Sequence, residues 1–259
     1  MPWEHVDTGW GRCAPEFAYL FENLHWREYI HLLDQTGVGP GTRYLDIACG
    51  CGLAVRLAGE RGALAGGLDA SPRLAAIAAA RSPEADIRVG DMFALPFPDH
   101  SFEVATSFRG IWGNGLDALR EARRVVCPGG KIGLSFWGHQ KQMQAYPLFA
   151  VLGQTSQAER EHTGELVRIG RPGAAEELMR SVGLEPGSRT SLHFSWEFPD
   201  VDLAARALAA SGPAYLAIQH LGAEAFMAAA RDAAAQLYVP GIGVRAEVEV
   251  HCLVGVVLG

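Results

Sequence analysis

The chain has 259 residues, of which 49% are hydrophobic and 20% are charged, and its net charge is −7 at pH 7. A disordered chain would be far more polar, so this composition indicates one large folded domain, or one domain with a sizeable insertion. The acidic balance and the absence of a run of Lys and Arg argue against nucleic acid as a partner.

Cysteine usage and hydropathy exclude further classes of protein. The five cysteines, at 13, 49, 51, 127 and 252, are odd in number and scattered, which is not the pattern of a disulfide framework. No second pair follows Cys49 and Cys51 at zinc-finger spacing, so we expect no metal site. The N-terminus lacks the apolar core of a signal peptide, and the stretch 250–259 is about half the ~20 residues that a membrane helix needs. We therefore expect a soluble, cytoplasmic protein that does not bind membranes.

Short strands alternate with helices in the first half of the chain. A helix is expected over 16–35, where apolar residues recur at helical spacing, and glycines and a proline at 37–41 end it. Strands are then expected at 44–47, 64–68, 86–89, 102–107 and 131–137, with helices at 53–61, 71–80 and 116–126 between them. This alternation predicts a parallel sheet that is covered on both faces.

The alternation loosens after residue 138. We expect helices at 144–154 and 174–181, and a return strand that opens at 183 and continues towards Trp196. Residues 200–236 are Ala-rich and helical, with a break at 211–213, and the chain ends in a β-rich run over 245–257. A helical insertion therefore lies between two late strands.

The segment 44–52 carries the most information about function. A buried strand runs into a glycine-rich turn that opens a helix, where a nucleotide can approach the backbone. The dinucleotide pattern G-x-G-x-x-G/A does not fit, because Leu53 or Val55 occupies its last small position. Asp46 lies within the strand, where it would repel a pyrophosphate and suit a cationic ligand. The turn therefore points away from NAD.

Five segments of the chain together carry a specific resemblance. They are 45–52 (L-D-I-A-C-G-C-G), 67–71, 89–92, 101–108 and 121–131 (E-A-R-R-V-V-C-P-G-G-K). In this order they resemble the motifs of class I S-adenosylmethionine-dependent methyltransferases, over roughly residues 40–137. With the pattern of elements, the resemblance implies a Rossmann-like α/β fold: a doubly wound, seven-stranded, mostly parallel sheet whose last strand is antiparallel, with an N-terminal helical cover and a helical insertion.

We accordingly expect a single domain over 1–259. Residues 1–40 would form an N-terminal helical lid and residues 41–137 the cofactor-binding core. Residues 138–259 would form a C-terminal part with the helical insertion at about 199–240.

The resemblance also assigns roles to three carboxylates. It implies that Asp46 binds the amino group of the methionine moiety, that Asp69 binds both ribose hydroxyls, and that Asp91 binds the adenine amino group while Met92 packs on the ring. The residues expected to contact S-adenosyl-L-methionine, or its product S-adenosyl-L-homocysteine, are Asp46, Ala48, Cys49, Gly50, Gly52, Asp69, Ala70, Ser71, Asp91, Met92, Phe93, Ser107 and Phe108.

Structural interpretations of these residues remain open. Asp46 and Asp69 could cap helices, Asp91 could serve a turn, and Cys49 and Cys51 could be inert small residues. The chain also departs from the family pattern. Alanine occupies position 48 in place of the first glycine, and glutamate occupies 103 in place of the usual aspartate. The absence of an N/D-P-P-Y/F tetrapeptide after the fourth strand argues against adenine, cytosine or glutamine as the acceptor.

Candidates for the acceptor side follow the fourth and fifth strands. Ligands in open α/β sheets bind at the carboxyl ends of the strands, so both loops should face the cleft. Arg109, Trp112 and Trp137 are expected to bind the acceptor, with Asn114 nearby, and His139 is either the general base or a solvated loop histidine. The other histidines have less positional support: His5, His25, His31, His193 and His220. Aromatic residues that could line the lid are Trp3, Trp10, Phe17, Tyr19, Phe21 and Trp26, although Phe17 and Phe21 suit an ordinary helix core equally well.

The reaction implied is methyl transfer from S-adenosylmethionine to O, N or C of a small, partly apolar metabolite. The partner expected is therefore a small-molecule acceptor, and the chain could be a monomer or a homodimer. Two alternatives stay open. One is an enzyme on the same scaffold that uses the bound sulfonium for cyclisation or decarboxylation, and the other is a non-catalytic module that only binds S-adenosylmethionine.

Overall fold

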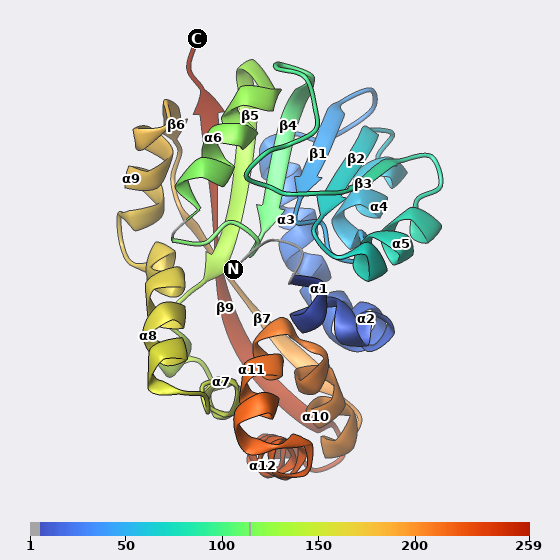
Figure 1. Cartoon of the computed structure of the whole chain (residues 1–259), viewed down its shortest axis with the longest axis vertical. Helices are drawn as coiled ribbons and strands as arrows, with labels where there is room; N and C mark the ends of the chain where they lie inside the picture. The colour runs from blue at the N-terminus through green and yellow to red at the C-terminus, as the bar shows by residue number, and fades with distance from the viewer. Residues whose placement is uncertain (1–5, 114) are drawn as a thin grey trace.

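A computed structural model describes residues 6–113 and 115–259 (Figure 1). Its centre is a sheet with the strand order β3-β2-β1-β4-β5-β9-β6. The parallel strands are β1 (Arg43–Ile47), β2 (Leu64–Asp69), β3 (Asp86–Val89), β4 (Phe102–Phe108) and β5 (Val126–Trp137). The last strand, β9 (Gly243–Val257), runs antiparallel to both β5 and β6 (Leu184–Pro186). The predicted seven-stranded arrangement with an antiparallel last strand is confirmed.

Helices cover both faces of this sheet. Tyr44 of β1 packs with α3 (Trp26–Thr36) and α4 (Leu53–Glu60) on one face. The next residue, Leu45, points to the other face, where α6 (Leu116–Val125) and α9 (Ala174–Ser181) cover it. Because successive side chains alternate between faces, β1 is buried on both sides, and its sequence is correspondingly apolar.

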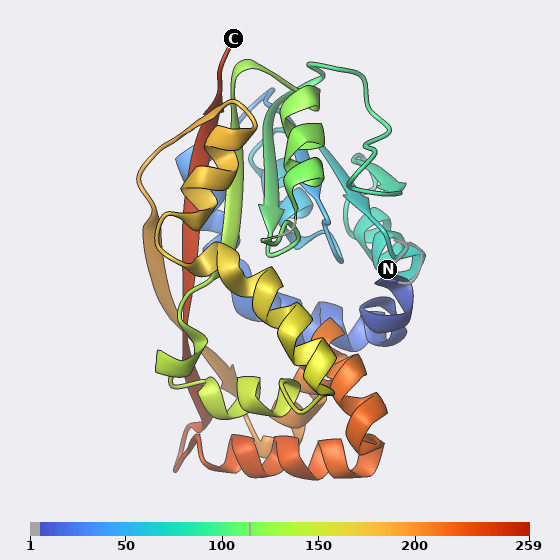
Figure 2. The same cartoon turned by 60° about the vertical axis from the view of Figure 1, so that its left-hand side comes forward.

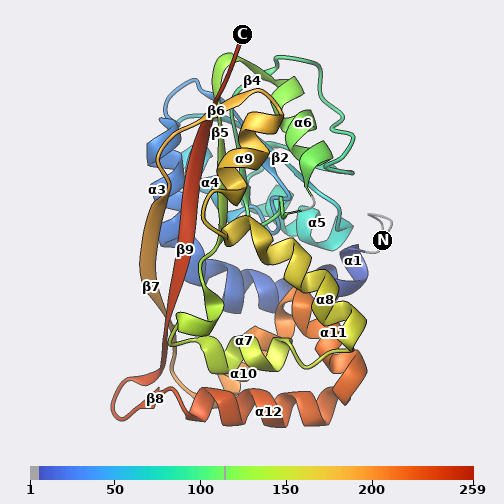
Figure 3. The same ribbon diagram turned by 90° about the vertical axis from the view of Figure 1, so that its left-hand side faces the viewer.

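The expected return strand forms two strands instead of one. The strand is interrupted after Pro186, and Gly187 donates its N–H to Val254 O. β6 pairs with the carboxyl end of β9, and β7 (Thr190–Phe198) pairs with residues 244–252 of the same strand. The short β8 (Tyr238–Val239) also pairs with β9. Figure 3 shows that β7 and β9 run side by side beyond the parallel sheet.

The predicted helical insertion packs on this extension. Its helices are α10 (Val201–Ala210), α11 (Gly212–Leu221) and α12 (Ala223–Ala235). Helix α7 (Tyr146–Leu152), from earlier in the chain, packs against them. Alanines let the helices approach closely around Trp196, Phe198 and Phe226. Three further helices lie between β5 and α9: η5 (Gln140–Gln142), α8 (Gln157–Leu166) and η6 (Val167–Gly170). The sequence analysis did not predict α8, which is mostly polar. Within the described residues, no helix combines the length and the apolar character that a membrane span needs.

The start of the chain is helical, but it is not the single helix that the periodicity predicts for 16–35. It consists of α1 (Val6–Gly9), η2 (Gly11–Cys13), α2 (Ala14–Glu16), the π-helical η3 (Phe17–Phe21) and the 3₁₀-helical η4 (Glu22–His25), followed by α3. We call residues 6–25 the N-terminal segment. Polar contacts on its inner side accompany the change of helix type, since Glu22 and His25 are both buried and bound to core groups.

The N-terminal segment lies between the sheet and the helical insertion (Figure 2). The guanidinium of Arg12 donates hydrogen bonds to Ala209 O and Ser211 O at the end of α10. Trp10 packs directly against Gly212, where the indole ring occupies the place of a Cβ. The segment therefore joins the two parts of the molecule.

One glycine fixes how closely α4 approaches α5 (Pro72–Arg81). Gly52, with φ +77°, precedes α4, and a Cβ built there would lie 2.6 Å from Ala78 Cβ in α5. We expect Gly52→Ala to cost about 1–3 kcal/mol more unfolding free energy than Gly41→Ala. Gly41 has nearly the same φ, +76°, and no described atom within 4 Å of its built Cβ, so it measures backbone strain without the overlap. Urea unfolding of both variants gives the difference, and equal losses would show that α4 and α5 do not pack through this glycine.

Candidate functional site

The carboxyl ends of β1, β2 and β4 meet at one edge of the sheet. The turn after β1 holds Ala48, Gly50 and Gly52 at φ of +59°, +56° and +77°. Such angles suit glycine and are strained for alanine, and they make the turn compact before α4 begins. Cys49 is buried in this turn and donates its backbone N–H to Leu68 O of β2.

Asp69 ties the end of β2 to the glycine-rich turn. Its Oδ2 accepts the N–H of Gly50 and its Oδ1 accepts the N–H of Ser71, both at 2.8 Å. Ser71 follows Ala70 and caps α5 through a hydrogen bond from Leu74 N. Burial raises the pKa of Asp69 to about 6, although the backbone N–H groups favour its charged form. The sequence analysis therefore located this carboxylate correctly at the turn, while ligand contact stays a prediction.

Asp46 lies on β1, beside β4, and only 2% of its surface is exposed. Its Oδ1 accepts a hydrogen bond from Thr106 Oγ1 at 2.9 Å. Burial, together with the charges of Glu22, Asp69 and Glu28, raises its pKa well above the usual range. Ser107, the next residue of β4, donates to Ile47 O at 2.8 Å and so holds the two strand ends together.

Glu22 is a member of the site that the sequence analysis missed. It comes from the N-terminal segment and lies over the turn, where its Oε1 accepts the N–H of Leu53 at 3.5 Å. Arg81 of α5 forms an ion pair with it. Burial raises the pKa of Glu22 to about 7 despite this arginine. The sequence held one signal for this role, because Glu22 is a charged residue among the apolar positions of an amphipathic stretch.

The residues expected to hold adenine follow β3, whose end is joined to this cluster by a hydrogen bond from Gly90 N to Asp69 O. Asp91 follows β3, and its side chain accepts the N–H of Phe93 at 2.9 Å, as in a local turn. Met92 is half-buried against the core, whereas Phe93 is 42% exposed. This edge of the site is thus open to solvent.

On the acceptor side, the structure brings Arg109 and Trp137 together. Arg109 follows β4 at φ +57°, and its guanidinium lies 5.0 Å from the Trp137 ring. The ring of Phe108 packs edge-on against Tyr29 with a centroid distance of 4.5 Å. The sequence analysis expects the loops after the fourth and fifth strands to face one cleft, and binding of an acceptor there stays a prediction.

His25 and Glu28, which the sequence analysis did not select, complete this group. His25 Nδ1 lies 3.1 Å from Glu28 Oε2, and Arg109 Nη1 lies within 3 Å of the imidazole. Burial and the charge of Arg109 lower the pKa of His25 to about 4, so the imidazole is neutral near pH 7. A signal existed in the sequence, because His25-x-x-Glu28 places both side chains on one helical face.

The other acceptor-side candidates are not joined to this group by described contacts. His139 is exposed and precedes η5, where its carbonyl accepts the N–H of Gln142. Trp112 is half-buried after β4. Trp3, His5 and Asn114 lie outside the described residues. The role of His139 as a base therefore stays a prediction.

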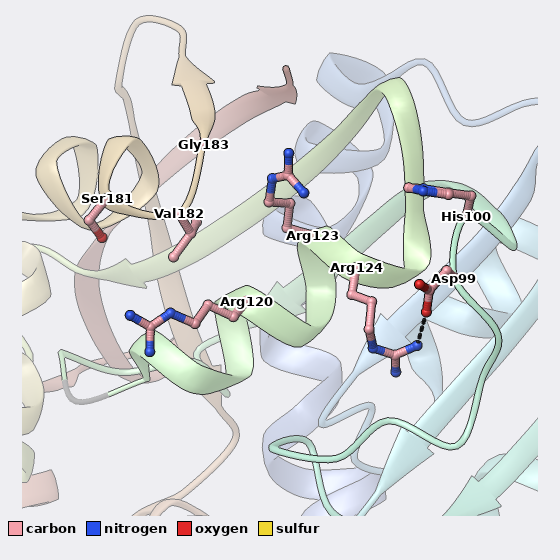
Figure 4. A pocket seen from close by; sticks show the side chains of 8 residues that line it. All are labelled: Asp99, His100, Arg120, Arg123, Arg124, Ser181, Val182 and Gly183. Carbon is pink, nitrogen blue, oxygen red and sulfur yellow. Dashed lines mark hydrogen bonds and ion pairs between the residues drawn. The ribbon is translucent and has the colours of Figure 1, made fainter. Parts of the chain in front are cut away.

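A surface pocket of about 550 Å³ lies elsewhere (Figure 4). Asp99 and His100 line it just before β4, at the opposite end of that strand from Phe108. Its arginines already have protein partners. Arg124 pairs with Asp99, Arg120 pairs with Asp117, and Arg123 donates to Leu258 O. The pocket is separate from the glycine-rich turn.

Comparison with known proteins identifies the core of the chain. Residues 45–134 match the family model described as a methyltransferase domain. The chain is 34% identical over 120 residues to a demethylmenaquinone methyltransferase of Renibacterium salmoninarum, across 46% of this chain and 50% of that protein. Residues 45–134 are therefore similar to methyltransferase domains, and the relatives support the resemblance to class I S-adenosylmethionine-dependent methyltransferases.

Further comparisons extend the likeness of the methyltransferase core. The chain is 35% identical over 148 residues to a 2-phytyl-1,4-naphtoquinone methyltransferase of Synechocystis, across 51% of this chain and 61% of that protein. It thus spans roughly half to three fifths of these relatives. A structure of phosphoethanolamine N-methyltransferase 2 from Haemonchus contortus, in complex with phosphomonomethylethanolamine and S-adenosylhomocysteine, superposes with a TM-score of 0.61. That structure is 17% identical and covers 100% of this chain and 61% of its own, so it shows the shared fold alone.

The raised pKa of Glu22 predicts a measurable dependence of stability on pH. An acid whose pKa is higher in the folded state binds more protons folded than unfolded, so its ionisation costs stability as pH rises from about 4.5 to 7. We expect Glu22→Gln to gain about 2 kcal/mol of unfolding free energy relative to wild type between pH 5 and pH 8.

Urea unfolding of both proteins at several pH values measures this difference. Because His25 titrates in both proteins, its contribution cancels. Glu16→Gln in the same segment is the matched control, because its side chain reaches solvent. If the unfolding free energies of Glu22→Gln and wild type changed with pH in the same way, the raised pKa of Glu22 would be contradicted.

Proposed function

We propose that this protein transfers the methyl group of S-adenosylmethionine to a small, partly apolar metabolite. The observation that carries the proposal is the convergence of three buried carboxylates, Glu22, Asp46 and Asp69, on a glycine-rich turn. Burying negative charge is costly unless a cation compensates it. Glu22 already pairs with Arg81, so Asp46 and Asp69 are the carboxylates that need compensation. A ligand with a sulfonium and an ammonium group would supply it, whereas the diphosphate of NAD would add to the repulsion.

The buried carboxylates fit the proposed cofactor residue by residue. Asp69 has both oxygens at the turn and would hold the ribose hydroxyls, and Asp46 lies close enough to attract the amino group of the methionine moiety. Asp91 and Met92 would contact adenine at the open edge beyond β3. The bound sulfonium supplies an already activated methyl group, so the protein's task is to align the acceptor and exclude water.

The remaining proposed cofactor contacts come from backbone and small side chains. Tight turns and strand ends let a ligand approach the main chain, and aromatic residues beside them can pack on it. These residues are Ala48, Cys49, Gly50, Gly52, Ala70, Ser71, Phe93, Ser107 and Phe108.

We infer that the N-terminal segment acts as a lid over this site. Glu22 and Phe17 lie within 3.5 Å of a Cβ built on Gly50, and Asp7 contacts Ser71. A ligand that reaches the turn must displace these side chains, so the segment would move when ligands exchange. Its succession of short α, π and 3₁₀ turns supports such movement, because none of them is a long cooperative helix.

Turnover separates this proposal from its alternatives. Protein is incubated with methyl-labelled S-adenosylmethionine and a metabolite extract, and labelled product and S-adenosylhomocysteine are quantified together. Equal amounts of the two support methyl transfer. Conversion of an acceptor without loss of label from the cofactor would support cyclisation or decarboxylation, and binding without any conversion would support a binding module.

The proposed function predicts a selectivity among ligands. We expect S-adenosylmethionine and S-adenosylhomocysteine to bind, and NAD not to bind, because Val55 and Leu53 break the dinucleotide pattern and Asp46 repels a pyrophosphate. Isothermal titration calorimetry with the three ligands measures this. Tight binding of NAD without any response to the other two ligands would end the proposal.

The proposed function also predicts the effect of replacing Asp69. We expect Asp69→Ala to weaken S-adenosylhomocysteine binding by at least ~tenfold, since hydrogen bonds to a charged group are worth ~1.5–3 kcal/mol. Asp232→Ala, at an exposed position on α12, is the matched control. Calorimetry on variants with native far-UV circular dichroism is the measurement. An unchanged dissociation constant for Asp69→Ala would place the ribose elsewhere.

A further inference from the structure

A buried ion pair holds the N-terminal segment on the glycine-rich turn. Glu22 is 3% exposed and pairs with Arg81 of α5, whose side chain is 14% exposed. The neighbouring residues Phe17, Ala18 and Phe21 are buried and apolar. Burying an ion pair costs about as much free energy as the pairing returns, so apolar residues would serve a purely structural contact equally well. A charged pair at this place therefore indicates a further role.

The carboxylate of Glu22 reaches two different groups with its two oxygens. Oε1 lies 3.5 Å from Leu53 N at the start of α4, and 3.4 Å from a Cβ built on Gly50. Oε2 pairs with Arg81 Nη1, which also donates to Cys51 O of the turn at 3.0 Å. One carboxylate thus spans the gap between the backbone of the turn and the guanidinium. A ligand carboxylate that lies on the turn can make the same two contacts.

This position is unfavourable for the anion of Glu22. Burial outweighs the pairing with Arg81 and raises the pKa of Glu22 to about 7. Glu22 is also among the charges that raise the pKa of Asp46, so the two carboxylates repel each other across the turn. A carboxylate that carries a cationic group in the same molecule would meet less repulsion, because its positive charge can face Asp46.

The cofactor of the proposed reaction has a carboxylate of this kind. In its methionine moiety the ammonium group has Asp46 as the proposed partner, whereas the carboxylate beside it needs a cation of the protein. Arg81 is positioned to be that cation. Its hydrogen bond to Cys51 O belongs to the turn and not to the N-terminal segment, so it would keep the guanidinium in place when Glu22 leaves.

We propose that Arg81 binds the carboxylate of the cofactor's methionine moiety, and that Glu22 occupies this place in the free protein. The inference rests on the methyl transfer proposed above. When the cofactor binds, its carboxylate replaces that of Glu22 at Arg81 and at Leu53 N, and Glu22 leaves with the N-terminal segment. Because one anion replaces another, Arg81 has a partner in both states.

This exchange makes the site selective among adenine nucleosides. A ligand without a carboxylate either leaves Glu22 in place or separates it from Arg81 without offering a substitute. An arginine left unpaired in a mostly buried position is costly. The site should therefore prefer ligands that carry the complete amino acid end of the cofactor.

The test compares S-adenosylhomocysteine with 5′-S-(3-aminopropyl)-5′-thioadenosine, which lacks only the carboxylate. Calorimetry at pH 8, where Glu22 is ionised, gives both dissociation constants for wild type, Glu22→Gln and Glu22→Gln/Arg81→Gln. The readout is the ratio of the two constants, in which a general change in closure of the segment cancels. We expect Glu22→Gln to raise the preference for S-adenosylhomocysteine by about fivefold, because a neutral amide competes less well for Arg81. The added Arg81→Gln should lower this preference by at least ~tenfold.

The matched control is Glu22→Gln/Arg56→Gln, which removes an exposed arginine of α4 and should keep the ratio of Glu22→Gln. The double variant at 22 and 81 leaves no unpaired buried charge. If it still does not fold, Glu22→Gln decides alone, because the exchange requires its ratio to rise.

Two results overturn this inference while leaving the proposed methyl transfer untouched. One is a ratio that Glu22→Gln does not raise, including the case in which both ligands bind more weakly because Glu22 holds the ammonium group. The other is a ratio that the added Arg81→Gln does not lower. If neither ligand binds the wild-type protein, the proposed function is overturned as well.

Discussion

Burial of negative charge at the carboxyl edge of the sheet is the constraint around which the site is built. Arg81 pairs with Glu22 and Arg109 with Glu28, whereas Asp46 and Asp69 are held by a hydroxyl and by backbone N–H groups. Among the residues that the structure describes, the second pair of carboxylates thus has hydrogen-bond donors but no ion pair with a cation. The low dielectric of the interior makes this arrangement costly, and the cost falls when a cation binds beside them. The same burial that weakens the free protein therefore favours a positively charged ligand.

Strand β9 explains how residues far apart in the sequence reach this edge. Its carboxyl half completes the parallel sheet against β5, and its amino half continues beyond the sheet to pair with β7. This extension places Phe194 and Trp196 of β7 beside His25. The helical insertion then covers the far side of the extension. The contacts of these rings with His25 therefore depend on the length of one strand.

The sequence predicted the parts of the site that depend on local pattern. The glycine-rich turn and Asp69 follow from a strand, a turn and a helix that are adjacent in the chain, and the structure joins Asp69 to Gly50 by a hydrogen bond. The alternation of elements predicted a parallel sheet covered on both faces, and the resemblance to methyltransferases implied its seven-stranded form. The sequence predicted helical structure over 16–35, but not its division into short α, π and 3₁₀ turns before α3. Periodicity does not reveal the buried polar contacts of Glu22.

The aromatic rings around His25 could not be predicted in the same way. Trp196 belongs to a strand whose pairing partner lies 50 residues further along the chain, at Ala246. His25 looked like one histidine among nine, because its partner Arg109 is 84 residues away. His139 was preferred because it follows a strand end, yet its side chain is exposed in the structure. Proximity to a strand end is a local property, whereas burial depends on the packing of distant elements.

The two halves of the site are mechanically linked through the short helix η4. Glu22, which lies on the glycine-rich turn, and His25, which lies among the aromatic rings, are its first and last residues. A 3₁₀-helix has three residues per turn, so these two side chains project from the same side of it. If a ligand displaced Glu22 from the turn, the backbone that carries His25 would also move. Beyond His25 the chain enters α3, which is packed on β5 and cannot follow freely. A displacement of Glu22 would thus be transmitted to the imidazole and to its contact with Arg109.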